Sequence, residues 1–372
     1  MIKKKNKNYR LVTEDRKKIF TIALFALMFG TFIMGLTAGA LCASPYRYDE
    51  LTIPILTYHK FCDGESPDEY TINVDLFQKH MKYLKDNDYR VISLTQLLEC
   101  VKNNFYPEKP VIITIDDGFK SIYNHAFPVL KEYNFPATLF LYTDFIGNNS
   151  NQLTWAEIKE MIAEGLEIGS HTLSHANLLN MKKNESYSDY HDRIKKEIQL
   201  SKNILEKNTG SPVLSFAYPY GVYSQEIMMM AKEAGYKALL NVNSMNNSIP
   251  INTYSLNRQI IFSACSLAQF QSIVQEKTLP VNDIFPPDGT VTDNQGLTIG
   301  AILSDTNIEL GSLGLRLSGA GLTHIYQPET QKISFTPDAP KLLQKRTWIA
   351  QITARDTDTG QRRKVAWLFT VR

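Results

Sequence analysis

The sequence predicts an α/β barrel that lies between two other parts, an apolar N-terminal helix and a C-terminal β-sandwich. Three observations lead to this fold class. Residues 19–46 carry no charge, residues 51–277 alternate short apolar runs with amphipathic stretches, and residues beyond 280 alternate apolar and polar side chains. These patterns are typical of a membrane-spanning helix, of βα units around a parallel sheet, and of antiparallel strands, in that order.

The N-terminal segment joins a basic tail to an apolar run. Residues 1–19 hold eight basic and two acidic side chains, a charge of +6, although the whole chain carries only +2. The run 20–44 is long enough to cross a bilayer, and its basic flank stays in the cytoplasm. We expect a basic cytoplasmic tail (1–19), a single transmembrane anchor (20–44) and a cell-membrane protein whose larger part lies outside the cytoplasm. The alternative is a signal peptide cut near Ala38-Gly39-Ala40, which gives a secreted protein.

The composition excludes several classes of protein. Apolar residues make up 43% and charged residues 21% of the chain, close to the average of globular proteins, which excludes general disorder and fibrous repeats. A net charge of +2 argues against nucleic acid as a partner. Four cysteines among 372 residues exclude a disulfide scaffold.

The barrel is expected within residues 45–277. Short apolar runs bounded by turn residues predict strands at 53–58, 111–115, 137–142, 166–169, 214–217, 238–242 and 256–260. Helical spacing of apolar residues predicts helices at 74–86, 188–207 and 225–234. A further helix is expected to start after Thr154, because Thr154 and Glu157 have the spacing of a capping box.

The sandwich is expected within residues 278–372. Proline-rich and glycine-rich turns at 279–280 and 285–289 separate it from the barrel. Beyond them, apolar side chains recur at every second position, as in the strands of a small antiparallel sandwich. The alternating residues are Leu313, Leu315, Leu317, Trp348, Ala350, Ile352, Val365, Trp367, Phe369 and Val371.

Polar residues follow four of the predicted barrel strands. They are Tyr58-His59, Asp116-Asp117, the histidines His171 and His175, and Tyr218-Pro219-Tyr220-Gly221. In a barrel of parallel strands, the C-terminal strand ends open onto one face, and that face holds the active site. We therefore expect these side chains to converge.

Each pair also has a plain structural explanation when it is taken alone. Asp116-Asp117 before a glycine can be a turn, and His171 with His175 can be a surface pair on a helix. Two neutral imidazoles and one carboxylate, however, make a divalent-metal site that leaves open positions for catalysis. Because all four residues follow neighbouring strands, the metal site is the favoured interpretation.

The motifs TIDDG, SHTLSH and YPYG, in this order, resemble those of the polysaccharide deacetylases of carbohydrate esterase family 4. The similarity runs from about residue 53 to 277 and includes PILTYHKF and AFPVLKEYNFPATLFL. It implies a distorted (β/α) barrel of deacetylase type that removes acetyl groups from a carbohydrate with the help of a metal ion. PILTYHKF and FAYPYG favour the subgroup that contains poly-N-acetylglucosamine deacetylases. In the tail, IGAILSDT, SFTPDAP and WLFTVR resemble immunoglobulin-like (Ig-like) modules of bacterial surface proteins.

The resemblance assigns roles to individual residues. Asp117, His171 and His175 match the metal ligands, and Asp116 matches the general base. The metal is expected to be zinc, with cobalt, nickel or manganese as alternatives. The YPYG motif places the substrate and the oxyanion near three residues, with the backbone N–H of the last as the oxyanion donor: Tyr218, Pro219 and Tyr220.

Two family features are missing from the sequence. Ala217 stands where many members have an arginine that orients the catalytic aspartate, and no histidine follows the late strand as a general acid. His59 is a candidate for the missing acid, because it ends the first strand, whereas Arg258 could stabilise charge but cannot donate a proton at neutral pH.

These features define the expected function and its alternatives. The leading hypothesis is hydrolysis of acetyl groups from an N-acetylated polysaccharide at the cell surface. An esterase for O-acetylated xylan is one alternative, because esters need less protonation of the leaving group. A non-catalytic glycan-binding relative is the other. The sandwich is expected to contact the cell wall or a protein partner.

Overall fold

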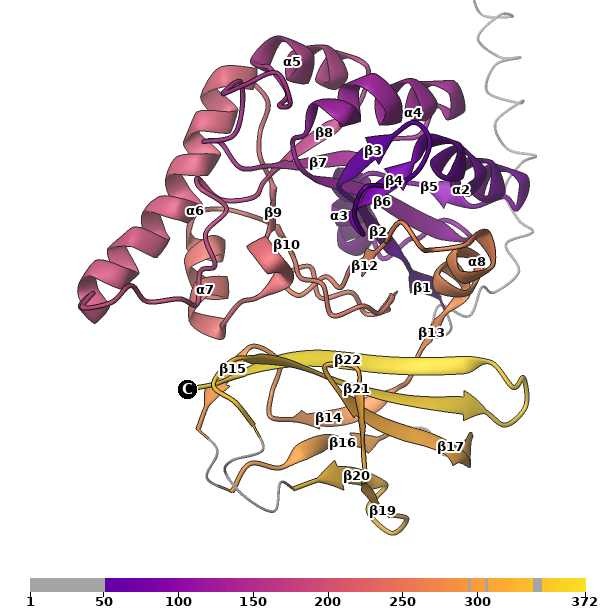
Figure 1. Cartoon of the computed structure of the whole chain (residues 1–372). Helices are drawn as coiled ribbons and strands as arrows, with labels where there is room; N and C mark the ends of the chain where they lie inside the picture. The colour runs from indigo at the N-terminus through magenta and orange to yellow at the C-terminus, as the bar shows by residue number, and fades with distance from the viewer. Residues whose placement is uncertain (1–50, 294–295, 305–306, 337–342) are drawn as a thin grey trace, which may run out of the picture. The chain divides into compact units, whose positions relative to one another are not determined.

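One parallel sheet forms the centre of the first half of the fold (Figure 1). Its strands lie in the order β10-β9-β8-β7-β6-β2-β12, with β5 beside β6. A parallel bridge between Leu240 and Leu256 joins the chain at the two ends of this order, so the sheet closes into an irregular barrel. The strands are β2 (Ile55–Tyr58), β5 (Arg90–Val91), β6 (Pro110–Asp117), β7 (Thr138–Leu141), β8 (Glu167–Ser170), β9 (Ser215–Ala217), β10 (Ala238–Leu240) and β12 (Gln259–Ile260).

Most of the barrel strands are short and largely buried. Every residue of β2, β7, β9 and β10 is buried. Strands covered on both faces need continuous apolar runs, and the sequence shows such runs at the predicted strand positions. The (β/α) barrel is thereby confirmed, and each of the seven predicted strands overlaps an observed one.

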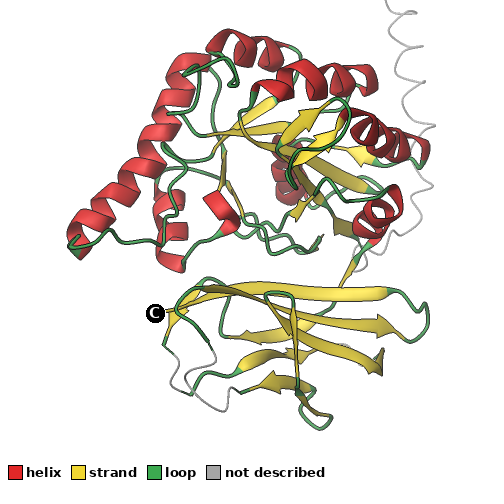
Figure 2. Cartoon of the chain, viewed as in Figure 1, coloured by secondary structure: helices red, strands yellow, loops and turns green. Residues whose placement is uncertain are grey.

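Helices surround this sheet, as Figure 2 shows in red around yellow. The helix that starts after Thr154 is confirmed with its full capping box, in which Thr154 and Glu157 exchange hydrogen bonds. Two further helices begin with Ser-to-Gln capping boxes that the sequence prediction missed, α3 and α8. The helices are α2 (Val74–Asp86), α3 (Leu94–Asn103), α4 (Phe127–Tyr133), α5 (Trp155–Ala163), α6 (Tyr187–Thr209), α7 (Gln225–Glu233) and α8 (Leu267–Gln275).

Short elements complete the barrel and carry its loops. β1 (Thr52–Ile53) pairs with β11 (Asn247–Ser248), and β3 (Lys60–Cys62) pairs with β4 (Thr71–Asn73). A π-helical turn (Ile122–Ala126) precedes α4, and a 3₁₀ turn (Pro219–Gly221) follows β9. These last two turns lie directly after β6 and β9, where the polar residues predicted for the site occur.

The C-terminal residues form two sheets that share one apolar core. Ile299 and Ile333 come from one sheet, and Ile352 and Trp367 come from the other. The first sheet has the order β14-β16-β20-β19, formed by Val281–Phe285, Ile299–Leu303, Lys332–Phe335 and Ile325–Gln327. The second has the order β13-β22-β21-β17-β18, with β15 beside β22, formed by Lys277–Thr278, Arg362–Val371, Thr347–Asp356, Ile308–Leu317, Ala320–Leu322 and Thr290–Thr292.

The sequence predicted a purely antiparallel sandwich, and the structure differs from this prediction. β13 and β15 both pair in parallel with β22, while the longer strands pair antiparallel. The alternation of buried and less buried residues along β21 matches the predicted period of two. The two short parallel strands escaped prediction because two or three residues are too few to show a period.

The computed structural model describes residues 51–293, 296–304, 307–336 and 343–372. The predicted tail (1–19) and apolar run (20–44) lie outside these ranges. Within the described ranges, no helix has both the length and the apolar character needed to cross a bilayer.

Candidate active site

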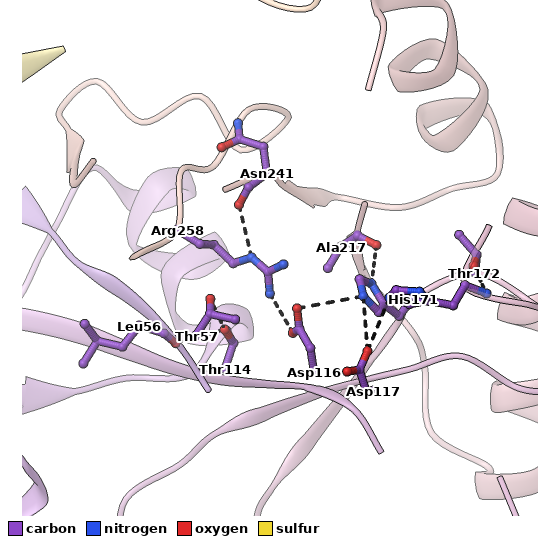
Figure 3. A network of polar contacts seen from close by, with 11 residues as sticks. Leu56, Thr57, Thr114, Asp116, Asp117, His171, Thr172, Ala217, Asn241 and Arg258 are labelled. Atoms are coloured by element: carbon purple, nitrogen blue, oxygen red, sulfur yellow. Dashed lines mark hydrogen bonds and ion pairs between the residues drawn. The ribbon is translucent and has the colours of Figure 1, made fainter. Parts of the chain in front are cut away.

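The polar residues predicted for the site lie at one edge of the barrel. β6 ends at Asp116-Asp117, β8 leads into His171, and β2 leads into His59. β6 lies between β2 and β7 in the sheet, and β8 follows β7. Because all these strands are parallel, their C-terminal ends meet at the same edge. Figure 3 shows Asp116, Asp117 and His171 pointing toward one another.

Asp117, His171 and His175 form a cluster of metal-binding type. One ligand atom from each lies within 4.8 Å of the others. Asp117 Oδ1 is 3.4 Å from His175 Nε2 and 3.8 Å from His171 Nε2. Two ligands that are each about 2 Å from one ion lie no more than about 4 Å apart, so these separations fit a shared ion.

Two further observations test whether these residues fit a cation. Asp117 Oδ1 is buried and accepts no hydrogen bond from the described residues, which is costly for a carboxylate unless a cation pairs with it. His171 Nδ1 lies 2.8 Å from the carbonyl oxygen of Ala217. A carbonyl only accepts, so Nδ1 donates the hydrogen bond and Nε2 keeps its lone pair toward the cluster. The donor set therefore fits a divalent ion.

The ionisation of these groups agrees with this assignment. Burial lowers the pKa of His171 to about 3 and also lowers that of His175, so both rings are neutral at pH 7. Burial, together with the charge of Asp116, raises the pKa of Asp117 to about 7. Neutral imidazoles with free lone pairs are the form that binds a metal ion.

Asp116 lies beside the cluster in a fully buried ion pair. It is 2% exposed, and its Oδ1 accepts a hydrogen bond of 2.7 Å from Arg258 Nη1. Its Oδ2 is 3.9 Å from His171 Nε2. Burial alone raises the pKa of Asp116, but the charge and hydrogen bond of Arg258, with help from His171 and His59, hold it below its usual value. Asp116 is therefore an anion at neutral pH.

Arg258 is the partner of Asp116 in this buried ion pair. It lies just before β12, is 1% exposed, and donates from Nε to the carbonyl oxygen of Asn241 at 3.2 Å. Its guanidinium also lies 5.3 Å from the centre of the Phe140 ring. The sequence suggested Arg258 only as a group that could stabilise charge; the structure places it against Asp116 (Figure 3).

Four residues of the motif loops have a left-handed backbone. The φ angles are 79° at Asp117, 72° at Thr172, 59° at His175 and 60° at Tyr220. Residues other than glycine rarely adopt this region, and each instance costs on the order of 1–3 kcal/mol. Such strain collects at functional sites, because the surrounding structure must hold the side chains in place.

Only one residue of Tyr218-Pro219-Tyr220 is placed to meet a substrate. Tyr220 is 61% exposed, and its ring centre is 4.8 Å from that of His175. Tyr218 is 1% exposed and stacks on Tyr223, and Pro219 is buried as well. The expectation that Tyr218 and Pro219 line the site is therefore corrected: both support the loop from inside.

Gly221 explains why the loop of Tyr220 is so closely packed. It has a φ of 68°, and a Cβ atom at this position would lie 2.0 Å from Val242 Cγ2. Only glycine allows the loop to approach the chain after β10 this closely. The turn is thus held against the barrel while Tyr220 stays exposed.

His59 is the remaining histidine at this edge. Its Nδ1 is buried and has no hydrogen-bond partner among the described residues. Burial lowers the pKa of His59 to about 4, although the charge of Asp116 acts in the opposite direction. The ring is therefore neutral at pH 7 in the free protein. His80, by contrast, lies in the core: it is fully buried, and its ring stacks on that of Phe270 with the ring centres 4.0 Å apart.

Glu197 supports the histidine loop and was missed in the sequence. This buried carboxylate on α6 accepts hydrogen bonds from the backbone N–H groups of Leu173 and Ser174, both at 3.0 Å, and from the Ser174 hydroxyl at 2.7 Å. The signal was available: Glu197 shares the apolar stripe of α6 with Ile194 and Ser201. A carboxylate on a buried helix face needs partners.

Glu197→Ala is expected to weaken metal binding about tenfold to a hundredfold, because residues that orient ligands have effects of this size. Three donors of the 171–175 loop would lose their acceptor. The measurement is competition with a chelator of known affinity. Lys196→Ala, on the exposed side of the same helix, is the matched control. Unchanged affinity in Glu197→Ala would show that the loop keeps its shape without this carboxylate.

Comparisons with known proteins agree with this geometry. The profile of the polysaccharide deacetylase family matches residues 103–239. YxkH of Bacillus subtilis (strain 168) is 30% identical over 60% of this chain and 76% of its own length. The poly-beta-1,6-N-acetyl-D-glucosamine N-deacetylase of Staphylococcus aureus (strain MRSA252) is 28% identical over 58% of this chain and 80% of its own. The Streptococcus pyogenes deacetylase PplD, solved in complex with acetate, superposes with a TM-score of 0.55 at 27% identity, covering 60% of this chain and 99% of PplD.

The barrel and its polar edge thus define a carbohydrate deacetylase, a hydrolase whose class depends on a divalent metal. The chain belongs to the polysaccharide deacetylase family, carbohydrate esterase family 4. The ordered motifs had indicated this family, and the comparisons confirm it.

Proposed function

We propose that this protein hydrolyses acetamide groups on poly-N-acetylglucosamine or a closely related N-acetylated polysaccharide. The observation that carries the proposal is the buried Asp116–Arg258 pair directly beside the Asp117, His171 and His175 cluster. Metal-assisted amide hydrolysis needs a general base in a fixed orientation next to the residues that bind the metal ion. The S. aureus relative, named as an N-deacetylase of this polymer, supports the choice of substrate.

Asp117, His171 and His175 would hold the ion, and zinc is the metal we propose. Two neutral imidazole nitrogens and one carboxylate oxygen are typical ligands of catalytic zinc sites. When bound, the ion polarises the acetamide carbonyl and lowers the pKa of a water molecule. Cobalt, nickel and manganese can bind to the same nitrogen and oxygen donors and are the alternatives to zinc.

Asp116 is proposed as the general base. It stays ionised because Arg258 pairs with it, so it can accept the proton of the attacking water. Arg258 also fixes the direction of the carboxylate, since it is itself held by the carbonyl of Asn241. The arginine is thus a positioning residue: it acts through Asp116 and not on the substrate.

Two other groups complete the proposed reaction. The backbone N–H of Tyr220 stabilises the negative oxygen of the tetrahedral intermediate, a role that the family motif suggests. His59 is proposed to deliver a proton to the departing amine. Its ring is neutral in the free protein, so it must first receive the proton that Asp116 takes from the attacking water; Asp116 is then an anion again, which favours the protonated ring.

The test is acetate release by the purified protein from three acetylated substrates. They are an oligomer of β-1,6-linked N-acetylglucosamine, a chitin oligomer and an O-acetylated xylan oligomer. We expect release from the β-1,6 oligomer, loss of activity after treatment with a chelator, and recovery with zinc. Release from xylan alone would support the esterase instead. A non-catalytic binder would be supported by two results together: glycan binding that the chelator does not change, and no acetate from any substrate after the metal is restored.

We also propose that residues 20–44 anchor the protein in the cell membrane and that the barrel acts outside the cytoplasm. The uncharged run and its basic flank support this arrangement. The sandwich, proposed as Ig-like, would then hold the barrel near the wall polymer or a protein partner. Protease treatment of intact cells tests the anchor: loss of the barrel with retention of residues 1–19 is expected, whereas a free barrel in the medium would indicate cleavage.

A further inference from the structure

Two aromatic rings lie exposed next to His59, and nothing in the chemistry above uses them. Tyr70 is 39% exposed and Phe262 is 38% exposed. Their ring centres are 5.5 Å apart at an angle of 60°, and the Tyr70 ring is 5.2 Å from that of His59. We call this pair the Tyr70–Phe262 platform.

The platform is held by hydrogen bonds between distant parts of the chain. The Ser263 N–H donates to the Glu69 carbonyl at 2.8 Å, which ties the residues after β12 to those before β4. The Tyr70 N–H donates to Asp68 Oδ1 at 2.9 Å, and the Tyr70 carbonyl accepts from the Lys60 N–H at 3.2 Å. The backbone of Tyr70 and that of Ser263, which follows Phe262, are therefore held by hydrogen bonds. The segments that carry the two rings are in place before a ligand binds.

The platform lies on the side of the site opposite to Tyr220. In the sheet, β2 and β12 flank β6 on one side, while β7, β8 and β9 follow on the other. His59 and Phe262 follow β2 and β12, whereas Tyr220 follows β9. Asp116 and Asp117, at the end of β6, thus have exposed aromatic rings on both sides.

An exposed aromatic pair beside a polar site fits the flat C–H face of a sugar ring. Exposing large rings to water is unfavourable, and more than a third of the surface of each of these residues stays exposed among the described residues. A pyranose whose substituents are equatorial presents an apolar face, while its hydroxyl groups remain in water. Aromatic side chains with a few convergent polar groups are the usual lining of such sites.

We propose that the Tyr70–Phe262 platform is a subsite that stacks on a sugar next to the one that loses its acetyl group. The inference rests on the proposed function, because it names which part of the substrate is bound. It gives the protein a preference for an oligomer of β-linked amino sugars over a single sugar, because a single sugar with its acetyl group at Asp116 has no second ring to stack on Tyr70 and Phe262.

The test compares N-acetylglucosamine oligomers of increasing length in wild-type protein, Tyr70→Ala and Phe262→Ala. For the longest oligomer, each variant is expected to lower kcat/KM by up to about tenfold, mainly through KM, since one aromatic contact contributes a factor of this size. The shortest substrate that is turned over should be almost unaffected. Tyr70→Phe keeps the ring and should behave like the wild type. Phe105→Ala, an exposed ring that is 68% accessible and lies after α3, is the control.

Binding of the same oligomers to Asp116→Asn separates this inference from the proposed function. If the wild type releases no acetate but the platform variants still weaken oligomer binding, the subsite stands and the proposed reaction fails. Suppose that the wild type releases acetate. The subsite inference is wrong if both platform variants lower the activity equally for oligomers of every length, or if neither variant lowers it for any length. Circular dichroism melting shows whether each variant is folded; if Tyr70→Ala is not, Phe262→Ala with Tyr70→Phe decides the question.

Discussion

Asp116→Asn is expected to lower kcat for acetate release by about a thousandfold, within the range for loss of a general acid or base. Asparagine cannot accept the proton of the attacking water. It can, however, accept the hydrogen bond from Arg258 through its side-chain oxygen, so the buried contact is kept. The buried charge of Arg258 loses its counter-ion, so the variant should also be less stable, and kcat is measured on the folded protein well below its melting temperature.

Metal content and melting temperature distinguish this result from a general defect. The variant is expected to bind as much zinc as the wild type, because Asp116 is not in the Asp117, His171 and His175 cluster. Asp192→Asn, a carboxylate with 69% side-chain exposure on α6, is the control and should keep full activity. Activity within a few-fold of the wild type in Asp116→Asn would remove this residue from the role of base.

Arg258→Met is expected to destabilise the protein and to remove most of its activity. Taking away one partner of a buried ion pair costs about 3–5 kcal/mol, because the other charge stays buried without compensation. Asp116 and Arg258 are 3% and 1% exposed in their side chains, so solvent cannot replace the lost contact. For a protein of this size, the melting temperature should fall on the order of 10 °C.

A double-mutant cycle tests whether Arg258 acts through Asp116. Adding Asp116→Asn to Arg258→Met removes the uncompensated anion, so part of the lost stability should return. Lys82→Met, which breaks an exposed pair with Asp86, should cost no more than about 1 kcal/mol. If the effects of Asp116→Asn and Arg258→Met on the melting temperature simply add, the pair is not coupled and Arg258 has another role.

The residues of the site differed in how well they could be predicted. Asp116, Asp117, His171 and His175 were predictable because they lie at the C-terminal ends of β6 and β8, two strands of one parallel sheet, and the topology brings those ends to the same edge. The partner of Asp116 was not predictable, because Arg258 is 142 residues away and the strand that follows it, β12, has only two residues. Sequence spacing carries no information about which late residue faces the edge.

Tyr218 shows a different limit. The YPYG motif led us to expect Tyr218 and Tyr220 at the same site, and residues two apart in an extended chain do face the same side. The left-handed backbone at Tyr220 breaks this alternation and turns its ring outward while Tyr218 stays in the core. A local change of one φ angle, which the residue type does not announce, decides which tyrosine is exposed.

The left-handed residues of the motif loops also bear on how this protein can be altered. Asn or Gly at Thr172 or Tyr220 would relieve backbone strain and gain up to about 1 kcal/mol of folding free energy. A directed-evolution experiment that selects only for heat resistance would therefore favour such changes and discard the side chains beside the metal ligands. A library built for thermostability should keep these loop positions fixed, because there the most stable sequence and the active sequence differ.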